Sequence, residues 1–332
     1  MTMKKAVVFA AMSIVCLASL FMYYDQPKEQ PAIVAVLSVN SERLKKLDGI
    51  RDGLWQYGFR DGENIKYVVF NAAELTGSLR SVAAEIVTMR PTVIVAMGGV
   101  EADILKELTR ESKTPVVFAG VAAPIARNLV TTYNQPGNLT GIDNLQSELG
   151  GKRLELFTLL LPKAKRFLVV YDKQVPSGEL SLEQIADTAQ KLQLELEIAS
   201  VTDWKQVDDI LRQAHNKRFD AIVLLPSYMW ETSVPIAEIA LTHGIPVLGL
   251  YEFEADRGFL ASYGPSYYNQ GIQAARLVAK VLQGQYPSQI PVERAYRLDF
   301  TINLRIAKKL GIDLNREALK IADKVIAGGV DQ

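Results

Sequence analysis

The sequence predicts an α/β protein with two doubly wound parallel-sheet lobes, joined by hinge strands and preceded by an N-terminal apolar signal or anchor helix. A repeated unit is the first observation: a short apolar run rich in β-branched residues precedes an amphipathic helix, as in parallel sheets covered on both faces. Turn-forming residues at 133–141 interrupt this rhythm, which then restarts. The chain's 332 residues, 48% of them hydrophobic, also suit two cores of roughly 120–150 residues each.

The first half of the chain shows the repeated unit most clearly. Residues 33–39 form an apolar run, and apolar residues then recur at helical spacing from Leu44 to Tyr57, where Gly58 ends the pattern. The other elements expected in this half are strands 65–70, 93–97 and 116–121 and helices 78–88 and 100–111. These elements predict a first lobe over residues 32–142.

The second half repeats the pattern and predicts a second lobe over residues 143–264. Its expected elements are helices 147–161, 180–192, 204–215 and 234–243 and strands 167–171, 196–201, 221–225 and 247–251. A long helix at 267–283 follows, so we expect residues 265–285 to complete the first lobe. Part of 286–332, including the segments 292–300 and 303–310, is expected to return across the hinge to the second lobe.

The N-terminus, residues 1–31, has the features of an export signal with a linker. Lys4 and Lys5 precede the apolar segment 6–24, and a polar, proline-containing stretch follows at 25–31. Two fates remain open, because cleavage after Ala18 and an uncleaved membrane anchor both fit a run of this length. Either fate predicts a periplasmic or extracytoplasmic globular part, secreted or held at the cytoplasmic membrane.

Composition excludes several classes of function. Lys plus Arg and Asp plus Glu both number 37, so we expect no nucleic acid partner, and membrane contact only through the N-terminal segment. The single cysteine, Cys16, lies in the apolar segment, which excludes a disulfide framework and a thiolate metal site. Neither a cofactor nor a metal is expected.

The residues for catalysis are also missing. His215 and His243 both end expected helices, and the sequence holds no nucleophile elbow, zinc-protease motif or phosphate-binding loop. Four acidic residues lie near strand ends, and we interpret them as solvated loop carboxylates: Asp172, Glu252, Glu254 and Asp256. The sequence therefore predicts a binding protein and no catalytic residues.

Candidate ligand-binding residues follow the carboxyl ends of the expected strands, where open α/β sheets hold their ligands. In the first lobe these are Ser38, Asn40, Ser41, Gly98, Gly99, Val100, Ala122 and Ala123. Toward the second lobe they are Asn144, Tyr171, Ser227, Tyr228, Trp230, Glu252 and Phe253. One small, polar wall and one aromatic wall suit a ligand with an ionic end and a flat apolar body.

Structural roles compete with ligand contact at several of these positions. Ser38, Asn40 and Ser41 are also suited to capping the next helix, and the two glycines to close packing of helix on strand. Glu252 is equally suited to meeting a ligand ammonium group or to accepting structural hydrogen bonds. For Tyr228 and Trp230, which lie in an expected loop, stacking on a ligand is the interpretation adopted.

Seven stretches in order along the chain resemble the ABC-transporter substrate-binding family that includes tryptophan- and tyrosine-type binders, with the type I periplasmic-binding-protein fold. They are 58–65 (GFRDGENI), 114–121 (TPVVFAGV), 136–142 (PGNLTGI), 152–156 (KRLEL) with 161–162 (LP), 262–264 (SYG), 282–284 (LQG) with 290–293 (IPVE), and 302–304 (INL) with Ala307, Leu310 and Gly311. The resemblance implies two lobes that close on a ligand, no reaction, and a membrane permease with an ATPase as partners.

The chain departs from the family's pattern at positions expected in the pocket. It has Ala122-Ala123 before Pro124 where many relatives carry a polar or acidic residue, and Asp143-Asn144 where they often have Ser-Asp. An insertion at 228–230 also changes one wall of the expected pocket.

From the sequence as a whole we expect a monomeric solute-binding protein of an importer, with an aromatic amino acid as one candidate cargo. A membrane-anchored ligand sensor is the alternative, and an enzyme acting at the cleft is the third reading.

Overall fold

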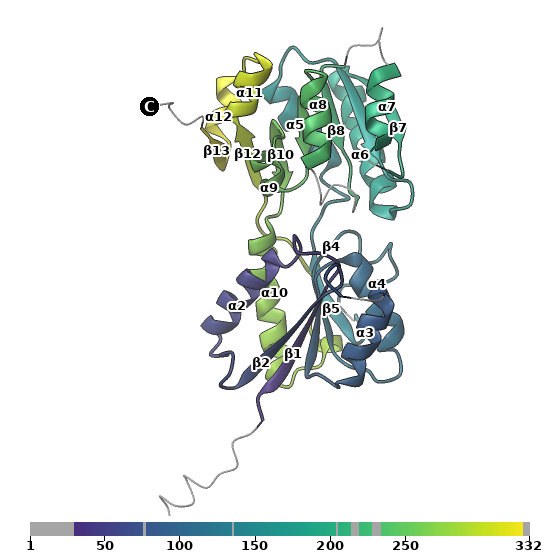
Figure 1. Cartoon of the computed structure of the whole chain (residues 1–332), viewed down its shortest axis with the longest axis vertical. Helices are drawn as coiled ribbons and strands as arrows, with labels where there is room; N and C mark the ends of the chain where they lie inside the picture. The colour runs from purple at the N-terminus through teal and green to yellow at the C-terminus, as the bar shows by residue number, and fades with distance from the viewer. Residues whose placement is uncertain are drawn as a thin grey trace, which may run out of the picture.

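The computed structural model describes residues 30–75, 78–134, 136–203, 205–213, 219–227 and 234–327. Two α/β lobes lie one above the other along the long axis of the molecule (Figure 1). Each lobe has its own sheet, so the predicted two-lobed α/β architecture is confirmed. The apolar segment 6–24 lies outside the described residues, and within them no helix has both the length and the apolar character needed to cross a membrane.

Lobe 1 contains a six-stranded sheet in the order β11-β5-β4-β3-β1-β2, and its paired strands run parallel. Its strands are β1 (Ala32–Ser38), β2 (Ile65–Asn71), β3 (Val93–Ala96), β4 (Val116–Val121), β5 (Leu139–Asp143) and β11 (Glu293–Arg294). Its helices are α2 (Lys45–Gln56), α3 (Leu79–Thr88), α4 (Gly99–Leu108) and α10 (Tyr267–Leu282), with the short 3-10 helix η2 (Pro287–Gln289). One core packs α2 and α10 against the sheet, and a second packs α3 and α4 against the other face.

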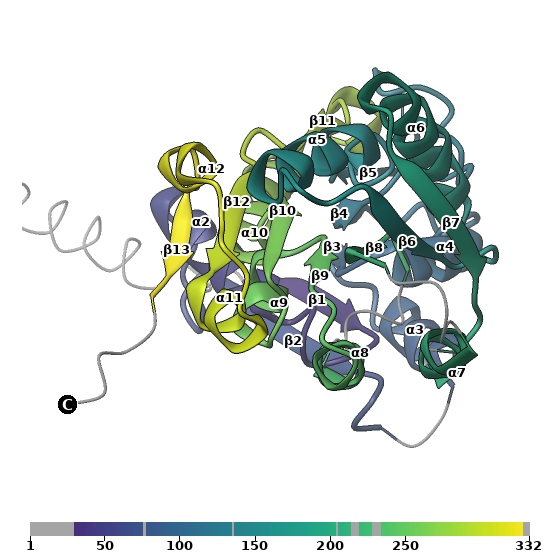
Figure 2. The same cartoon turned by 90° about the horizontal axis from the view of Figure 1, so that it is seen from above.

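Lobe 2 contains a seven-stranded sheet in the order β13-β12-β10-β9-β8-β6-β7, which Figure 2 shows from above. Its strands are β6 (Arg166–Tyr171), β7 (Glu195–Ser200), β8 (Ala221–Leu224), β9 (Val247–Gly249), β10 (Ala261–Gly264), β12 (Asp299–Asn303) and β13 (Lys324–Ile326). Its helices are α5 (Gly150–Leu160), α6 (Pro176–Leu192), α7 (Lys205–Gln213), α8 (Val234–Thr242), α9 (Glu252–Asp256), α11 (Leu304–Leu310) and α12 (Arg316–Lys320). Again one core lies on each face of the sheet.

The sheet of lobe 2 is not wholly parallel as predicted, because β10 and β12 pair in antiparallel fashion. The path of the chain explains this difference. β10 leads out of lobe 2 into α10 and β11 of lobe 1, and β12 then re-enters lobe 2 from the hinge side. A strand that returns beside the one that left must run in the opposite direction.

A buried arginine ties the hinge segments together. The chain crosses between the lobes after β5, after β10 and between β11 and β12. Arg153, on α5 and fully buried, donates from Nε to the carbonyl oxygen of Tyr263 (2.8 Å) and from Nη1 to that of Gln146 (3.3 Å). The Gln146 side chain in turn donates to the carbonyl oxygen of Leu250 (3.2 Å). Segments next to two of the crossings are therefore joined around one guanidinium group.

Candidate ligand-binding cleft

A pocket lies between the two lobes, where loops and helix ends from both sheets meet. On the lobe 1 side it is lined by Arg43, Lys46, Gly98, Gly99, Gly120, Val121, Ala122, Arg127 and Tyr267. The hinge and lobe 2 contribute Asn144, Gln146, Val175, Ser177, Pro226, Ser227 and Tyr251. This is the place where the ends of parallel strands converge, as expected for ligand sites in open α/β folds.

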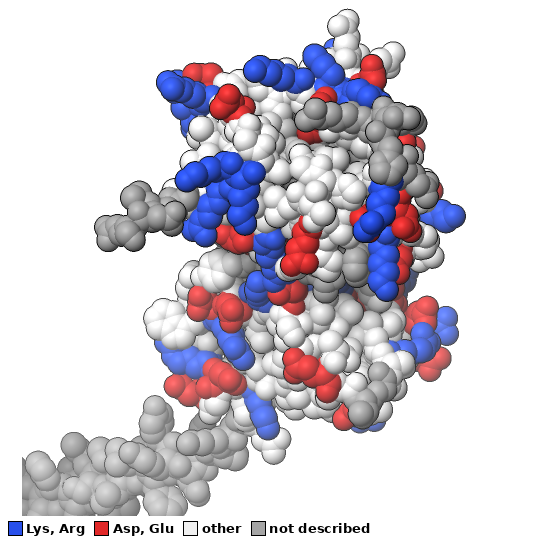
Figure 3. All heavy atoms as spheres, turned by 45° about the horizontal axis from the view of Figure 1, so that its top comes forward, with Lys and Arg blue, Asp and Glu red and all other residues white. Residues whose placement is uncertain are grey.

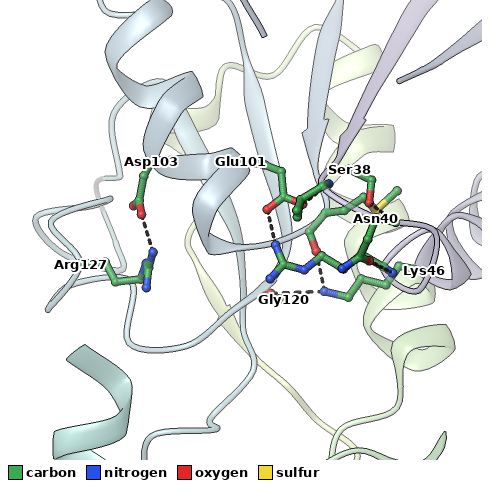
Figure 4. A network of polar contacts seen from close by, with 10 residues as sticks. Ser38, Asn40, Lys46, Glu101, Asp103, Gly120 and Arg127 are labelled. Atoms are coloured by element: carbon green, nitrogen blue, oxygen red, sulfur yellow. Dashed lines mark hydrogen bonds and ion pairs between the residues drawn. The ribbon is translucent and has the colours of Figure 1, made fainter. Parts of the chain in front are cut away.

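Three basic side chains form the lobe 1 wall, and Figure 4 shows polar contacts of two of them, Lys46 and Arg127. Arg43, 4% exposed, pairs through Nη1 with Oε2 of the fully buried Glu101. Lys46, 2% exposed, donates to the carbonyl oxygens of Met97 (2.7 Å) and Gly120 (3.4 Å). Arg127 pairs through Nη2 with Asp103, also on α4. The carboxylate partners lie on α4, while the cations face the pocket.

The start of α4 lies directly under these cations. A Cβ atom on Gly98 would come within 2.3 Å of Arg43 Nη1, and one on Gly99 within 2.9 Å of Arg127 Cζ. The glycines thus allow two guanidinium groups to approach the helix N-terminus closely. No side chain caps α4 at Gly98, and this end of the helix carries partial positive charge.

The lobe 2 wall presents a second helix N-terminus and hydroxyl groups. α6 begins at Pro176, preceded by Val175, and has no side-chain cap hydrogen bond. The helix was expected to start near residue 180, but proline at the first helical position favours the earlier start. Close by, the Ser227 hydroxyl donates to Asp172 Oδ2 (2.9 Å).

Aromatic rings form the hinge side of the pocket. Tyr251 and Tyr267 both line it, and their ring centroids lie 4.9 Å apart in a tilted arrangement. Phe253 stacks behind them on Tyr251, with centroids 5.5 Å apart. Lys46 Nζ lies 4.7 Å from the centre of the Tyr267 ring, a cation–π distance. A planar or apolar group can pack against these rings.

The structure brings only some of the predicted binding residues into this pocket: Gly98, Gly99, Ala122, Asn144 and Ser227. The others that it describes do not line it: Ser38, Asn40, Ser41, Val100, Ala123, Tyr171, Glu252 and Phe253. Tyr228 and Trp230 lie outside the described residues.

Local hydrogen bonds and packing explain several of these positions. Ser38 donates to the carbonyl oxygen of Asn40 (2.7 Å), and Asn40 Oδ1 accepts from the Arg43 N–H (3.0 Å) in the turn before α2. The N-cap of α2 itself is Leu44 and has no side-chain cap hydrogen bond, so the competing role of capping this helix is not observed. Ser41 donates to Glu74 on the surface. Tyr171 packs against the lobe 2 core. Each side chain is thereby directed away from the pocket.

Sequence reasoning missed the basic residues and the two tyrosines of the pocket. Arg43 lies in the turn before α2 and Lys46 in its first turn, two and five residues beyond Ser41, and both line the pocket. Tyr251 immediately precedes the predicted Glu252 and Phe253. A wider window around each strand end would have found these three residues, whereas nothing in the sequence marks Arg127 or Tyr267.

Of the four acidic residues expected to be solvated loop carboxylates, Asp256 is about half exposed and pairs with Lys324. The expectation is wrong for Asp172 and Glu254, which are buried beside the cleft. Asp172 is 4% exposed and Glu254 is fully buried. Glu254 accepts hydrogen bonds from the N–H groups of Leu250 and Tyr251. Burial raises the pKa of Glu254 to about 7, despite these bonds. The strand ends are therefore packed against the hinge and not open to water.

Glu252 connects the two lobes and gives a pH-dependent prediction. Its Oε1 accepts from the N–H of Tyr267, the first residue of α10 (3.1 Å), and its buried Oε2 has no hydrogen-bond partner. Burial raises the pKa of Glu252 from 4.5 to about 7. A group with a raised folded-state pKa contributes stability below its unfolded pKa, and that contribution is lost as pH rises through the folded value.

We therefore expect the wild-type protein to lose stability relative to Glu252→Gln between pH 4.5 and pH 8. The expected loss is about 3 kcal/mol, because each unit of pKa difference corresponds to about 1.4 kcal/mol. Urea unfolding of both proteins at several pH values measures the difference. Parallel stability profiles for the two proteins would contradict it.

Comparison with known proteins identifies the family. The family described as ABC transporter substrate binding protein matches residues 31–326. This chain belongs to that family. Members of this family bind solutes. Within the described residues, no group of three or more His, Cys, Asp or Glu side chains could hold a metal ion.

Individual relatives agree with this assignment. The chain is 26% identical over 288 residues to a tyrosine-binding protein of Clostridioides difficile (strain R20291), covering 86% of this chain and 82% of the relative. The ABC domain of Streptococcus pneumonia in complex with L-Trp has a TM-score of 0.79 at 23% identity, over 90% of this substrate-binding protein and 100% of that chain. A ligand-free, open substrate-binding protein with adhesive properties from Clostridium difficile has a TM-score of 0.67 at 25% identity, over 85% and 95%. The fold is that of periplasmic binding proteins.

Proposed function

We propose that this protein is the extracytoplasmic solute-binding component of an ABC-type importer, and that it captures a small molecule in the cleft between its lobes. The observation that carries the proposal is the pocket itself, to which both lobes and the hinge contribute side chains. A solute held there contacts both lobes at once and stabilises the arrangement in which they are close. Partner proteins would be a membrane permease and its ATPase, and the protein would act as a monomer.

Closure of the lobes is part of this proposal. In the present arrangement the cleft leaves a volume of about 50 Å³, whereas pockets for small organic ligands usually measure about 300–1,000 Å³. A solute of amino-acid size therefore requires the lobes to separate before it enters.

Export would bring the lobes to the solute outside the cytoplasm. The charged start, the apolar segment 6–24 and the linker 25–31 favour an export signal. Cleavage would release the protein, and retention would anchor it to the cytoplasmic membrane by this segment. Figure 3 shows basic and acidic side chains interspersed over both lobes on the face drawn.

A thermal-shift screen tests the proposed function. The purified chain is heated with amino acids, organic acids, small peptides or sugars, one compound at a time. A solute that binds only the native state at 100 times its Kd stabilises that state by about 2.7 kcal/mol and raises the Tm. We expect one chemical class to raise the Tm clearly, with the aromatic amino acids bound by the relatives among the compounds tested. If no compound in any class shifts the Tm, the proposed function fails.

A further inference from the structure

All the charged side chains known to line the cleft are basic. Arg43, Lys46 and Arg127 are basic, and among the described residues no Asp or Glu lines the pocket. The exposed fraction of the Arg43 and Arg127 side chains is 5% and 8%. Cations held in so little water act strongly on any charge placed between the lobes. Glu101 and Asp103 offset part of this charge from behind the wall, but the surface that faces a ligand carries only basic groups among its charged side chains.

Two helix N-termini add to this positive character from opposite sides. α4 in lobe 1 and α6 in lobe 2 both begin at the pocket, at Gly99 and Pro176, and neither has a side-chain cap hydrogen bond. A helix start without a capping oxygen can direct N–H groups toward an anion. In α6 the Ser177 N–H is the candidate, because Pro176 has no N–H and the Gly178 N–H donates to the carbonyl oxygen of Val175 (2.8 Å). A carboxylate in the closed cleft would satisfy groups from both lobes.

The carboxylates near the pocket are already engaged in the protein. Glu101 accepts from the Val39 N–H through Oε1 (3.0 Å) and pairs with Arg43 through Oε2. Asp172 accepts from the Gln174 N–H through Oδ1 (2.9 Å) and from the Ser227 hydroxyl through Oδ2 (2.9 Å). These carboxylates support the wall of the pocket and do not line it.

Two of the polar acceptors that line the pocket, the side-chain oxygens of Asn144 and Gln146, already accept hydrogen bonds. Asn144 Oδ1 accepts from the Gln146 N–H (3.2 Å), and Gln146 Oε1 accepts from Arg153 Nη2. An ammonium group has three donors and needs acceptors for them. In this pocket it would instead face Arg43, Lys46 and Arg127, and an unpaired buried charge is costly.

We propose, on the basis of the function proposed above, that the solute is an organic anion without an ammonium group. Its carboxylate lies among the three cations and the starts of α4 and α6, and its body packs against the rings of Tyr251 and Tyr267. The cleft thus differs in cargo from the tyrosine-binding relative. Neutral sugars do not supply the charge that this wall is built to hold.

Titration of the full chain with matched ligand pairs tests this inference. The pairs are L-tyrosine with 3-(4-hydroxyphenyl)propionate, L-tryptophan with indole-3-propionate, and L-alanine with propionate, and glucose is the neutral compound. We expect the acid to bind at least about tenfold more tightly than the amino acid in the best pair, which corresponds to about 1.4 kcal/mol. The affinity should fall as salt is added.

Each outcome decides between the proposals. Equal or tighter binding of the amino acid, or binding of glucose alone, overturns the anion inference and leaves solute binding intact. If none of these ligands binds and only amino acids, peptides or sugars raise the Tm in the screen, the anion inference alone fails. If no compound binds in either experiment, both proposals fail.

Two variants locate the selectivity in the cleft. Asn144→Asp introduces a carboxylate of nearly the same size at the lining, and it should lower affinity for the acid about tenfold and raise it for the matching amino acid. Lys46→Met removes one cation and should lower the affinity for the acid about tenfold or more. The matched control is Lys191→Met, a surface lysine on α6, which should bind as the wild type does. An Asn144→Asp protein with unchanged preference would overturn the inference even if Lys46→Met failed to fold.

Discussion

Replacing Arg153 with methionine destabilises the protein by an expected 3–5 kcal/mol, roughly the cost of breaking a buried charged network. The guanidinium donates to the carbonyl oxygens of Tyr263 and Gln146 and to the Gln146 side chain. Methionine preserves much of the volume but leaves these acceptors buried and unsatisfied. It also removes the positive charge that lowers the pKa of Glu254. The hinge segments would lose their common partner.

Lys152→Met is the matched control for this substitution. Lys152 is the preceding residue on α5, is half exposed and pairs with Glu155 on the surface at 2.9 Å. Surface ion pairs contribute about 0–1 kcal/mol. Urea unfolding of both variants measures the two effects on one scale. Equal losses of stability would show that Arg153 does not hold the hinge together.

Replacing Gly271 with alanine forces apart α2 and α10, with an expected cost of about 3 kcal/mol. A Cβ atom at this position would lie 2.0 Å from the carbonyl oxygen of Lys46 and 3.1 Å from the Cα atom of Gly49. Both obstacles are backbone atoms, so the helices themselves must move. Figure 1 shows the two helices side by side on one face of the lobe 1 sheet. Since Lys46 lines the cleft, the same substitution should weaken solute binding.

Gly284→Ala separates this packing effect from backbone strain. Gly284 has a φ of +92° and no atom within 4 Å of an added Cβ. An alanine there meets only the backbone penalty, about 1–2 kcal/mol. Thermal unfolding of both variants, with solute titration of Gly271→Ala, checks the prediction. If Gly271→Ala were as stable as Gly284→Ala, the stability of the protein would not depend on the close contact of α2 with α10.

The order of strands and helices could be predicted from the sequence because each continuous apolar run is about as long as one buried strand. The runs at 33–39, 93–97 and 116–121 became β1, β3 and β4, with bounds shifted by one residue at most. Helix ends were less accurate, as at α6, where Pro176 starts the helix four residues early. Local propensity places an element, while its ends depend on capping and packing.

The antiparallel pairing of β12 and the composition of the cleft were beyond the sequence. Nothing local distinguishes a strand that returns from the other lobe from one that continues the parallel order. Likewise, Arg127 and Tyr267 come from segments 140 residues apart, and both reach the lobe 1 side of the cleft only because α10 returns to pack on the lobe 1 sheet. The expectation that ligands bind at the carboxyl ends of parallel strands identified several loops of the pocket. It did not identify the residues in or next to helices whose side chains line the pocket.

By itself, the sequence determined the α/β class, the two lobes and the solute-binding family, because periodicity and motifs are local properties of the chain. Only the tertiary structure decided which side chains face the cleft. Ser38 and Tyr171 follow strands as the binding rule requires, yet hydrogen bonding and core packing direct them elsewhere. Arg43 and Lys46 converge with Arg127 from two separate segments of the chain. The direction of a side chain depends on neighbours that are distant in sequence, and these are set only when the lobes are packed.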